Sequence, residues 1–337
     1  MAKDTPSVTS STDTPPVLTR WYIDTRHLTV STTALPLLET LQATDQTAVQ
    51  KYYHMKDKHM SLTSNLLKYL FIHRTCRVPW SSIVISRTPD PHKRPCYIPS
   101  SDSKASGEDT VVNVEFNVSH QASMVAIAGT TIPPGVTPKP EVGLDITCVN
   151  ERQGRKGEER SLDALHKYID IFSEVFSAAE MDAMRSLHGA PSSSSPTGER
   201  LVEYGYRLFY TYWALKEAYI KMTGEALLAP WLRELEFSNV IAPAAVAESG
   251  EVADQFGEPY TGVKTTLYKK VVEDVRIEVA ALNGDYLFAT AARGGGLGAG
   301  PQSEPGSESP DAWMPFKKLD IERDIRPCAT GVCSCLS

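Results

Sequence analysis

A proline-rich segment near the middle of the chain limits the possible folds more than any other feature of the sequence. Residues 131–140 (TIPPGVTPKP) contain four prolines. Proline fixes φ and lacks the backbone donor that helices and sheets use, so neither can continue through this segment. The chain of 337 residues is therefore expected to fold as two halves joined by a loop, since its length fits two medium domains.

Both halves have the pattern of helices packed on a mostly antiparallel sheet, which predicts an α+β fold class. Helical periodicity is expected at 44–74, within 161–187 and from about 201 to 223. Strands are predicted where β-branched residues are frequent and turn formers intervene, with Asn283-Gly284 as a hairpin turn. The predicted strands are 17–23, 81–86, 111–116, 123–129, 141–147, 265–271, 275–282 and 286–292.

The predicted division of the chain has four parts. A disordered leader at 1–16 precedes an N-terminal half at 17–135 and a C-terminal half at 136–293. Residues 294–337 are expected to form a flexible Gly/Ser/Pro linker and a cysteine-containing tail, because such a linker buries too little apolar surface to offset its conformational entropy.

Charge and hydropathy exclude several classes of protein. The formal net charge is −7, whereas a nucleic-acid-binding protein normally has a concentrated basic face. The sequence contains no run of about eighteen apolar residues, so no membrane-spanning helix is predicted. The polar N-terminus lacks the apolar core of a secretory signal. We expect a cytoplasmic protein with reduced thiols that binds neither nucleic acid nor membrane.

Three of the six cysteines lie together in the tail, at Cys328, Cys333 and Cys335. This group could bind a metal or be acylated, but no second Cys or His pair at zinc spacing accompanies it. A prenylation signal needs a cysteine fourth from the end, where Ser334 stands. The role of the tail cysteines stays open at this point.

The helix predicted after residue 201 contains the most informative motif. Its segment WALKEAYIK places Trp213, Glu217 and Lys221 one turn apart on one helix face. The same spacing is typical of a solvated Glu–Lys pair beside a core tryptophan, and such pairs contribute little to stability. The helix alone therefore leaves both interpretations open.

Two strand ends bring further polar groups. Asp145 follows the apolar run of the strand at 141–147, and carboxylates are the ligands that Mg²⁺ prefers, although an aspartate opening a turn gives the same pattern. Ser119 and His120 come just past the predicted strand at 111–116 and could both donate to phosphate. A serine hydrolase is not indicated, because adjacent side chains in a strand point apart and no G-x-S-x-G motif occurs.

Two clusters of cations suit a polyphosphate ligand in this acidic chain, although solvated surface gives the same composition. One is KYYHMKDKHMS at 51–61, which ends with Ser61, and the other is HKRP at 92–95, which contains Arg94.

Taken in order, these segments resemble the Sfp-type 4′-phosphopantetheinyl transferases. The signatures of that family are a (V/I)G(I/V)D strand and a W-x-x-K-E-x-x-x-K helix, which correspond here to VGLD at 142–145 and WALKEAYIK at 213–221. The similarity extends over about 21–292 and includes YHMKDKH at 53–59 and NVSH at 117–120.

The resemblance implies a pseudo-dimer of two similar α/β halves that binds coenzyme A in the cleft between them, and hence a monomer. It implies that Asp145 and Glu217 ligate Mg²⁺, that Glu217 also serves as the base, and that Lys221 neutralises the pyrophosphate and the leaving group. Residues implied to contact the coenzyme A are Ser61, Arg94, Ser119, His120, Lys216 and Lys221.

Two positions depart from the family pattern. Thr147 stands where bacterial relatives often carry a glutamate as a third metal ligand, and a water molecule would have to replace it. The lysines that some relatives place before the Y-H segment correspond to Asp45 and Ala48. Compensation by a lysine at 51, 56 or 58 is open.

The implied reaction moves the phosphopantetheine arm of coenzyme A to a serine of an apo carrier domain and releases adenosine 3′,5′-bisphosphate. Carrier domains of polyketide synthases, non-ribosomal peptide synthetases, fatty acid synthases and aminoadipate reductases are the implied partners. An alternative is a non-catalytic protein that binds coenzyme A or carrier domains. A second is another magnesium-dependent nucleotidyl or phosphoryl transferase, although no P-loop or kinase motif is present.

Overall fold

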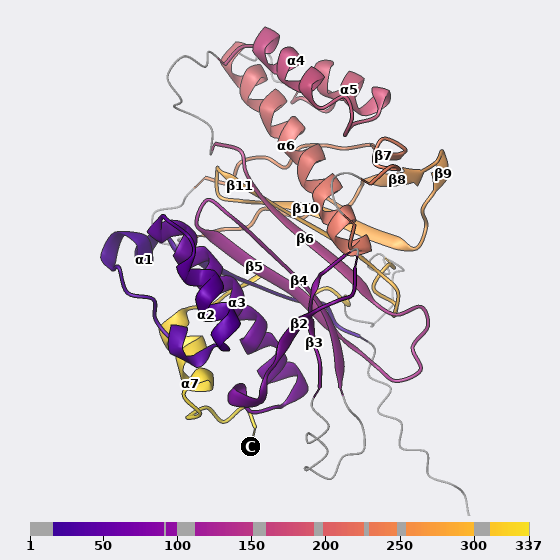
Figure 1. Cartoon of the computed structure of the whole chain (residues 1–337). Helices are drawn as coiled ribbons and strands as arrows, with labels where there is room; N and C mark the ends of the chain where they lie inside the picture. The colour runs from indigo at the N-terminus through magenta and orange to yellow at the C-terminus, as the bar shows by residue number, and fades with distance from the viewer. Residues whose placement is uncertain are drawn as a thin grey trace, which may run out of the picture.

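The computed structural model describes residues 16–90, 92–99, 112–150, 160–191, 198–225, 229–247, 254–299 and 311–336. Within them, helices cover the outer faces of two sheets that pack against each other (Figure 1). The predicted α+β class with antiparallel sheets is confirmed. The predicted leader lies outside the described residues except for its last residue, and so do residues 300–310 of the predicted linker.

The first sheet has the strand order β12-β1-β5-β4. Strands β1 (Thr19–Asp24), β4 (Asn113–Gln121) and β5 (Met124–Ile132) are antiparallel neighbours, with β5 in the middle. Side chains alternate along β5, so Val125 and Ile127 face the helices while Ala126 and Ala128 face the second sheet. Burial on both faces explains why this strand reads as a continuous apolar run.

Three helices cover the outer face of this sheet: α1 (Arg26–Ser31), α2 (Ala43–Gln50) and α3 (Met55–Cys76). The single helix predicted over 44–74 is two helices, because His54 is extended and begins α3. α3 packs an apolar face of leucines and Phe71 against β5. It ends at Cys76, and the next residue, Arg77, caps the helix with a left-handed φ of 52°.

The second sheet has the order β10-β11-β6 and is fully antiparallel. Its strands are β6 (Glu141–Cys148), β10 (Val275–Leu282) and β11 (Tyr286–Arg293). Asn283 takes a φ of 51° in the hairpin between β10 and β11, as the Asn-Gly pair predicted. The long helix α6 (Gly198–Thr223) crosses the outer face, and α4 (Leu162–Ile171) and α5 (Ala178–Arg185) lie beyond it (Figure 1).

Two smaller sheets complete the described strands. β2 (Ile85–Arg87) pairs with β3 (Pro95–Tyr97), while β7 (Leu235–Ser238), β8 (Lys264–Leu267) and β9 (Lys270–Val271) form the other. The strand predicted over 265–271 is therefore two strands. Tyr268 and Lys269 turn the chain between them with φ values of 49° and 62°.

The two large sheets face each other across an apolar layer. Tyr22 and Met124 from the first sheet share this layer with Val142, Leu144 and Ile146 of β6. Because β6 side chains alternate, the intervening residues of that strand point to the opposite face, toward α6. Asp145 is one of them.

Strand β4 joins β6 through side chains. Asn117 Oδ1 accepts from the amide of Leu144 at 3.2 Å, Ser119 Oγ from Ile146 at 3.2 Å and Gln121 Oε1 from Cys148 at 2.8 Å. We call these three bonds the side-chain ladder. Every second residue of β4 thereby bonds to every second amide of β6.

The C-terminal tail folds back onto the first half. β12 (Lys317–Lys318) pairs in parallel with β1, a π-helical turn follows at Ile321–Ile325, and α7 (Arg326–Ala329) packs beside α3 (Figure 1). The sequence predicted a tail after a flexible linker and did not predict this packing, because the apolar residues of the tail are few and widely spaced. No helix in the described parts of the chain is long and apolar enough to cross a membrane.

Candidate active site

Asp145 is the centre of a polar cluster between β6 and α6. Lys221 Nζ lies 2.6 Å from Asp145 Oδ1 and 3.0 Å from Ser119 Oγ, and Ser119 Oγ donates to the same carboxylate oxygen at 3.3 Å. Asp145 is 5% exposed, whereas the side chain of Lys221 is 28% exposed. The predicted residues Ser119, Asp145 and Lys221 are therefore in contact, although they come from three separate elements.

A glycine permits the close approach of helix and strand that this cluster needs. A Cβ at Gly143 would lie 1.9 Å from the carbonyl oxygen of Ala218 and 2.4 Å from the amide nitrogen of Met222. Only a residue without a side chain fits there without moving the helix. Gly143 thus lets α6 pack close enough to β6 for Lys221 to reach Asp145.

Thr147 supports the aspartate from within the same strand. Its hydroxyl donates to Asp145 Oδ2 at 2.8 Å. The two oxygens of Asp145 therefore receive different partners, Thr147 on one and Lys221 with Ser119 on the other. In this structure Thr147 orients the carboxylate.

Glu217 lies one turn before Lys221 on α6 and is half-buried. Burial raises the pKa of Glu217, Lys221 opposes this shift, and the negative charge of Asp145 raises the pKa further. The predicted pair of carboxylates is therefore close enough for mutual repulsion. A group whose charged form is disfavoured accepts a proton more readily than an ordinary glutamate.

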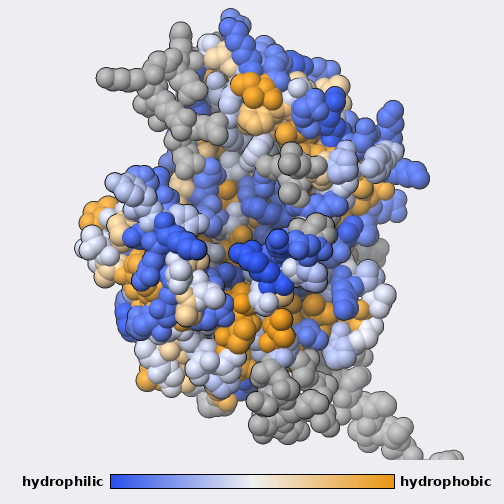
Figure 2. All heavy atoms as spheres, viewed as in Figure 1, coloured by the Kyte–Doolittle hydropathy of each residue, from blue (hydrophilic) through white to orange (hydrophobic). Residues whose placement is uncertain are grey.

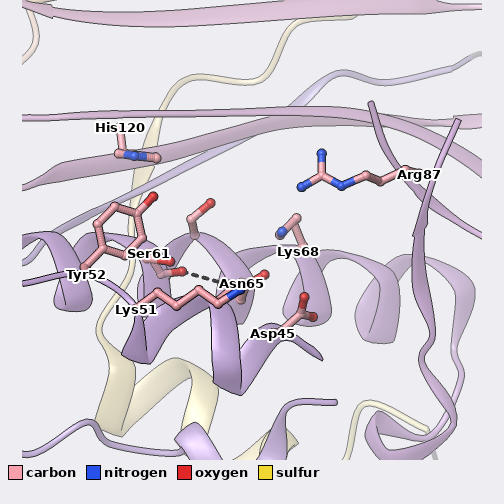
Figure 3. Close-up of a pocket in the computed structure, with 10 residues that line it drawn as sticks. Asp45, Lys51, Tyr52, Ser61, Asn65, Lys68, Arg87 and His120 are labelled. Atoms are coloured by element: carbon pink, nitrogen blue, oxygen red, sulfur yellow. Dashed lines mark hydrogen bonds between the residues drawn. The ribbon is translucent and has the colours of Figure 1, made fainter. Parts of the chain in front are cut away.

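A basic pocket of about 420 Å³ lies next to this cluster. Figure 3 shows Lys68 and Arg87 at one end, and Tyr52, Ser61 and His120 at the other. Figure 2 shows hydrophilic side chains gathered on this face of the molecule, over the region of α3 and β2. The remaining lining residues are Asp45, Ala48, Lys51, Ser64 and Asn65.

The cations of the pocket raise its affinity for anions. Burial lowers the pKa of Lys68 to about 8, and Arg87 lowers it while Asp45 opposes the shift. Desolvation also lowers the pKa of His120, as does the charge of Lys221. A bound phosphate would relieve this crowding of positive charge, which favours a phosphate ligand.

The strand β4 links the pocket to the carboxylates. Ser119 and His120 are consecutive residues, so their side chains point to opposite sides of the strand. Ser119 is buried against Asp145, whereas His120 is exposed and lines the pocket. The two predicted phosphate-binding residues thus lie in adjoining parts of one region.

The sequence left open which lysine, at 51, 56 or 58, would replace the lysines that some relatives place before the Y-H segment. Of the three lysines considered, Lys51 lines the pocket, together with Asp45 and Ala48. Lys68 and Arg87 were not predicted, because one lies in the apolar pattern of α3 and the other on a short strand. A lysine interrupting a buried helical face was the signal for Lys68.

Arg94, which the resemblance places near the nucleotide, lies among strands and the end of a helix. Its guanidinium donates to Glu115 Oε1 at 2.6 Å and to the carbonyl oxygens of Val142 at 3.1 Å and Met222 at 3.4 Å. Arg94 therefore joins β4, β6 and the end of α6, and it does not line the pocket described above.

Lys216 is the one predicted ligand-binding residue whose position rules out that role. It is 0% exposed, forms an ion pair with Glu180 at 2.9 Å and donates to the carbonyl oxygens of Leu232 and Leu235. Consecutive helical residues are about 100° apart, so the face that brings Glu217 to Asp145 turns Lys216 into the core. We therefore remove Lys216 from the candidate ligand-binding residues.

Two family models match most of the chain. Residues 30–132 match the N-terminal domain of 4′-phosphopantetheinyl transferase, and residues 141–279 match the 4′-phosphopantetheinyl transferase superfamily. The chain belongs to the 4′-phosphopantetheinyl transferase superfamily, a family of transferase enzymes that take the arm from coenzyme A and act on carrier domains. The boundary between the two matches falls within the proline-rich segment.

Individual relatives extend this finding. The chain is 75% identical to 4′-phosphopantetheinyl transferase NpgA of Emericella nidulans over 98% of this chain and 99% of that protein. It is 58% identical to 4′-phosphopantetheinyl transferase A of Aspergillus fumigatus over 95% and 96% of the two chains. The L-aminoadipate-semialdehyde dehydrogenase-phosphopantetheinyl transferase of Mus musculus is 21% identical over 56% of this chain and 50% of its own. The resemblance to this family that the motifs predicted is confirmed, and the similarity to NpgA covers nearly the whole chain.

Proposed function

We propose that the cluster of Asp145, Glu217 and Lys221 catalyses transfer of the phosphopantetheine arm from coenzyme A to a serine of an apo carrier domain. The observation that carries this assignment is the placement of two carboxylates and a lysine, at the meeting of β6 and α6, beside a basic pocket. The motifs of the family fall on these residues. The active site would lie in a cleft between the two halves of a pseudo-dimer.

A magnesium ion fits the donor set. Asp145 and Glu217 provide oxygen ligands, which Mg²⁺ prefers, and their mutual repulsion, which contributes to the raised pKa of Glu217, is what a divalent cation would relieve. Asp145 and Glu217 would hold the ion, and water would take the position that Thr147 leaves. When bound, the ion would supply charge stabilisation at the pyrophosphate oxygens.

Coenzyme A would bind with its nucleotide end in the basic pocket. Ser61 and Lys51 would meet the 3′-phosphate, Lys68 and Arg87 would add positive charge from the other end of the pocket, and His120 would contact the pyrophosphate together with Ser119. Arg94 would act from outside the pocket by fixing β4 and β6 relative to α6. This order places the pyrophosphate next to Lys221.

The reaction then follows from the charges. The serine oxygen of the carrier forms a bond to the β-phosphorus of coenzyme A, and the bond from that phosphorus to the bridging oxygen breaks. Glu217 accepts the serine proton as the new bond forms. Lys221 stabilises the negative charge on the leaving adenosine 3′,5′-bisphosphate.

The carrier domains proposed as substrates are those of polyketide, non-ribosomal peptide and fatty acid synthases and of aminoadipate reductase. The names of the relatives support carrier modification in general and the aminoadipate system in particular. We further propose that the protein acts as a monomer in the cytoplasm, since each half would supply one wall of the cleft.

The test is transfer by the purified full-length chain. The protein is mixed with coenzyme A, MgCl₂ and an apo carrier domain, and the carrier is weighed by intact mass spectrometry. We expect the carrier to gain one phosphopantetheine arm, to gain none in EDTA and to gain it again when Mg²⁺ is restored. An unmodified carrier, together with calorimetric binding of coenzyme A, would instead identify a non-catalytic binding protein. Transfer that persists in EDTA would refute the magnesium assignment alone.

A further inference from the structure

The tail cysteines meet a histidine from the other end of the chain. The sulfurs of Cys328, Cys333 and Cys335 and a ring nitrogen of His73 all lie within 4.8 Å of one another. His73 is on α3, while the cysteines lie in and just after α7. We propose that His73, Cys328, Cys333 and Cys335 form a structural zinc site that fastens the C-terminal tail to α3.

Two separations between the donor atoms are close to those of tetrahedral zinc. Cys328 Sγ lies 3.6 Å from Cys335 Sγ, and His73 Nε2 lies 3.2 Å from Cys333 Sγ. With Zn–S bonds of about 2.3 Å and Zn–N bonds of about 2.1 Å, tetrahedral angles separate two sulfurs by roughly 3.8 Å and a sulfur from a nitrogen by roughly 3.6 Å. Thiolate and imidazole are also the donors of closed structural zinc sites.

The histidine is already oriented as a metal ligand. Its Nδ1 lies 2.7 Å from the carbonyl oxygen of Val78, and a carbonyl can only accept. Nδ1 therefore carries the proton, which leaves the lone pair of Nε2 directed at the sulfurs. A backbone carbonyl that fixes the tautomer in this way is the usual outer partner of a zinc-bound histidine.

The surroundings of the cluster also suit a bound ion. His73 is 2% exposed and Cys328 is 1% exposed, whereas Cys333 and Cys335 are half-buried, so the site is closed on one side and accessible on the other. Arg74 lies 3.9 Å from Cys328 Sγ. Three thiolates and one zinc ion carry a net charge of −1, which the guanidinium would balance.

The backbone of the tail forms a compact loop around these donors. The amides of Val332 and Cys333 both bond to the carbonyl oxygen of Pro327, at 2.9 and 3.0 Å, and Gly331 takes a φ of 76°. This turn brings Cys333 back over the end of α7. A disulfide would explain less, since the 3.6 Å between Cys328 and Cys335 exceeds a bond of about 2.05 Å and any pair would leave a third cysteine unpaired.

The experiment measures zinc in the full-length chain. The wild type and the variants Cys333→Ser, Cys335→Ser and His73→Gln are expressed with added zinc, desalted and analysed by inductively coupled plasma mass spectrometry. Cys96→Ser is the matched control, because Cys96 is also half-buried and lies outside the cluster. We expect one zinc per chain in the wild type and the control, and a loss of about tenfold or more in the three variants.

A second measurement keeps the proposal testable if a variant fails to fold. Cobalt titrated into the reduced, metal-free wild type should give the visible absorption of a tetrahedral site and thiolate-to-metal charge transfer. Three results would overturn the proposal: a wild type that binds neither zinc nor cobalt, variants that keep the full zinc content, or a disulfide or acyl group on the tail cysteines in the intact mass.

Discussion

Helix α6 carries two lysines that form ion pairs in opposite environments. Lys216 and Glu180 are both 0% exposed, and carbonyl oxygens satisfy the remaining donors of the lysine. Lys221 pairs with Asp145 at 2.6 Å but is 28% exposed, and it also contacts Ser119. The first pair belongs to the core of the C-terminal half, whereas the second lies where a ligand can reach it.

The difference follows from helical geometry. Five positions along a helix correspond to a rotation of about 140°, so the two lysines cannot share a face. An ion pair that is closed off from water and ligands can contribute only to the stability of the fold, because no other group can replace either partner. A charge pair open on one side can exchange that partner for a phosphate. The same motif therefore contains one lysine closed into the core and another that a ligand can reach.

The largest expected effect belongs to Glu217, on the open face. Glu217→Gln removes the proposed base and one metal ligand, and we expect transfer to fall by about 10³-fold or more while the fold is kept. The checks are the carrier mass assay and circular dichroism of the variant. Near-normal transfer would contradict the assignment of Glu217.

A substitution at Lys216 should act on stability alone. Lys216→Ala leaves the carboxylate of Glu180 buried without its partner, which costs about 3–5 kcal/mol. Urea unfolding should show this loss, while the folded fraction keeps its transfer rate. Replacing both partners, as Lys216→Met with Glu180→Gln, should recover much of the stability. A Lys216→Ala variant of normal stability with a lost affinity for coenzyme A would reverse our interpretation.

The matching substitution at Lys221 should show the opposite profile. Lys221→Ala removes a cation from the pyrophosphate and leaving group, so we expect transfer to drop by roughly 10²–10³-fold. Its partial exposure limits the loss of stability to about 1 kcal/mol. Carrier assays and thermal unfolding separate the two effects. If only stability changes, Lys221 is a structural residue like Lys216.

The pH dependence should give the smallest effect and sharpen the comparison further. In the metal-free protein the pKa of Glu217 is raised, so Mg²⁺ binding, and with it transfer at limiting Mg²⁺, should be lost on acidification at a higher pH than an ordinary glutamate would give. Lys221 opposes the rise in the pKa of Glu217, so in the Lys221→Ala variant the loss on acidification should begin at a still higher pH. In the folded apo protein a raised carboxyl pKa also means that stability increases as the pH falls from neutrality toward it. A loss at the same pH in Lys221→Ala and in the wild type would contradict this electrostatic coupling between Glu217 and Lys221.

The sequence predicted the polar cluster around Asp145 better than it predicted the pocket. Strand alternation and helical spacing place Asp145, Glu217 and Lys221 on defined faces, so local patterns sufficed once the family motif was seen. The pocket required knowing that β2 passes over α3, which brings Arg87 to Lys68. No local pattern contains that information, because it depends on tertiary packing.

The remaining errors have physical causes of the same kind. Lys216 was assigned to the ligand through its motif, although its spacing from Glu217 already turned it away. The break between α2 and α3 depends on the extended conformation of a single residue, His54. The sequence left the role of the tail cysteines open, because the histidine that lies beside them, His73, comes from the distant helix α3.

The side-chain ladder between β4 and β6 has a consequence for how the halves can move. Its three bonds repeat every two residues on both strands. A displacement of one residue would bring Asn117, Ser119 and Gln121 opposite residues of β6 whose amides face β11 instead. The next alignment that restores bonding is two residues away, roughly 6.6 Å along the strand. The side-chain ladder therefore permits only alignments of β4 and β6 that differ by two residues. Small sliding motions would break all three bonds, so they are opposed, and Ser119 stays beside Asp145.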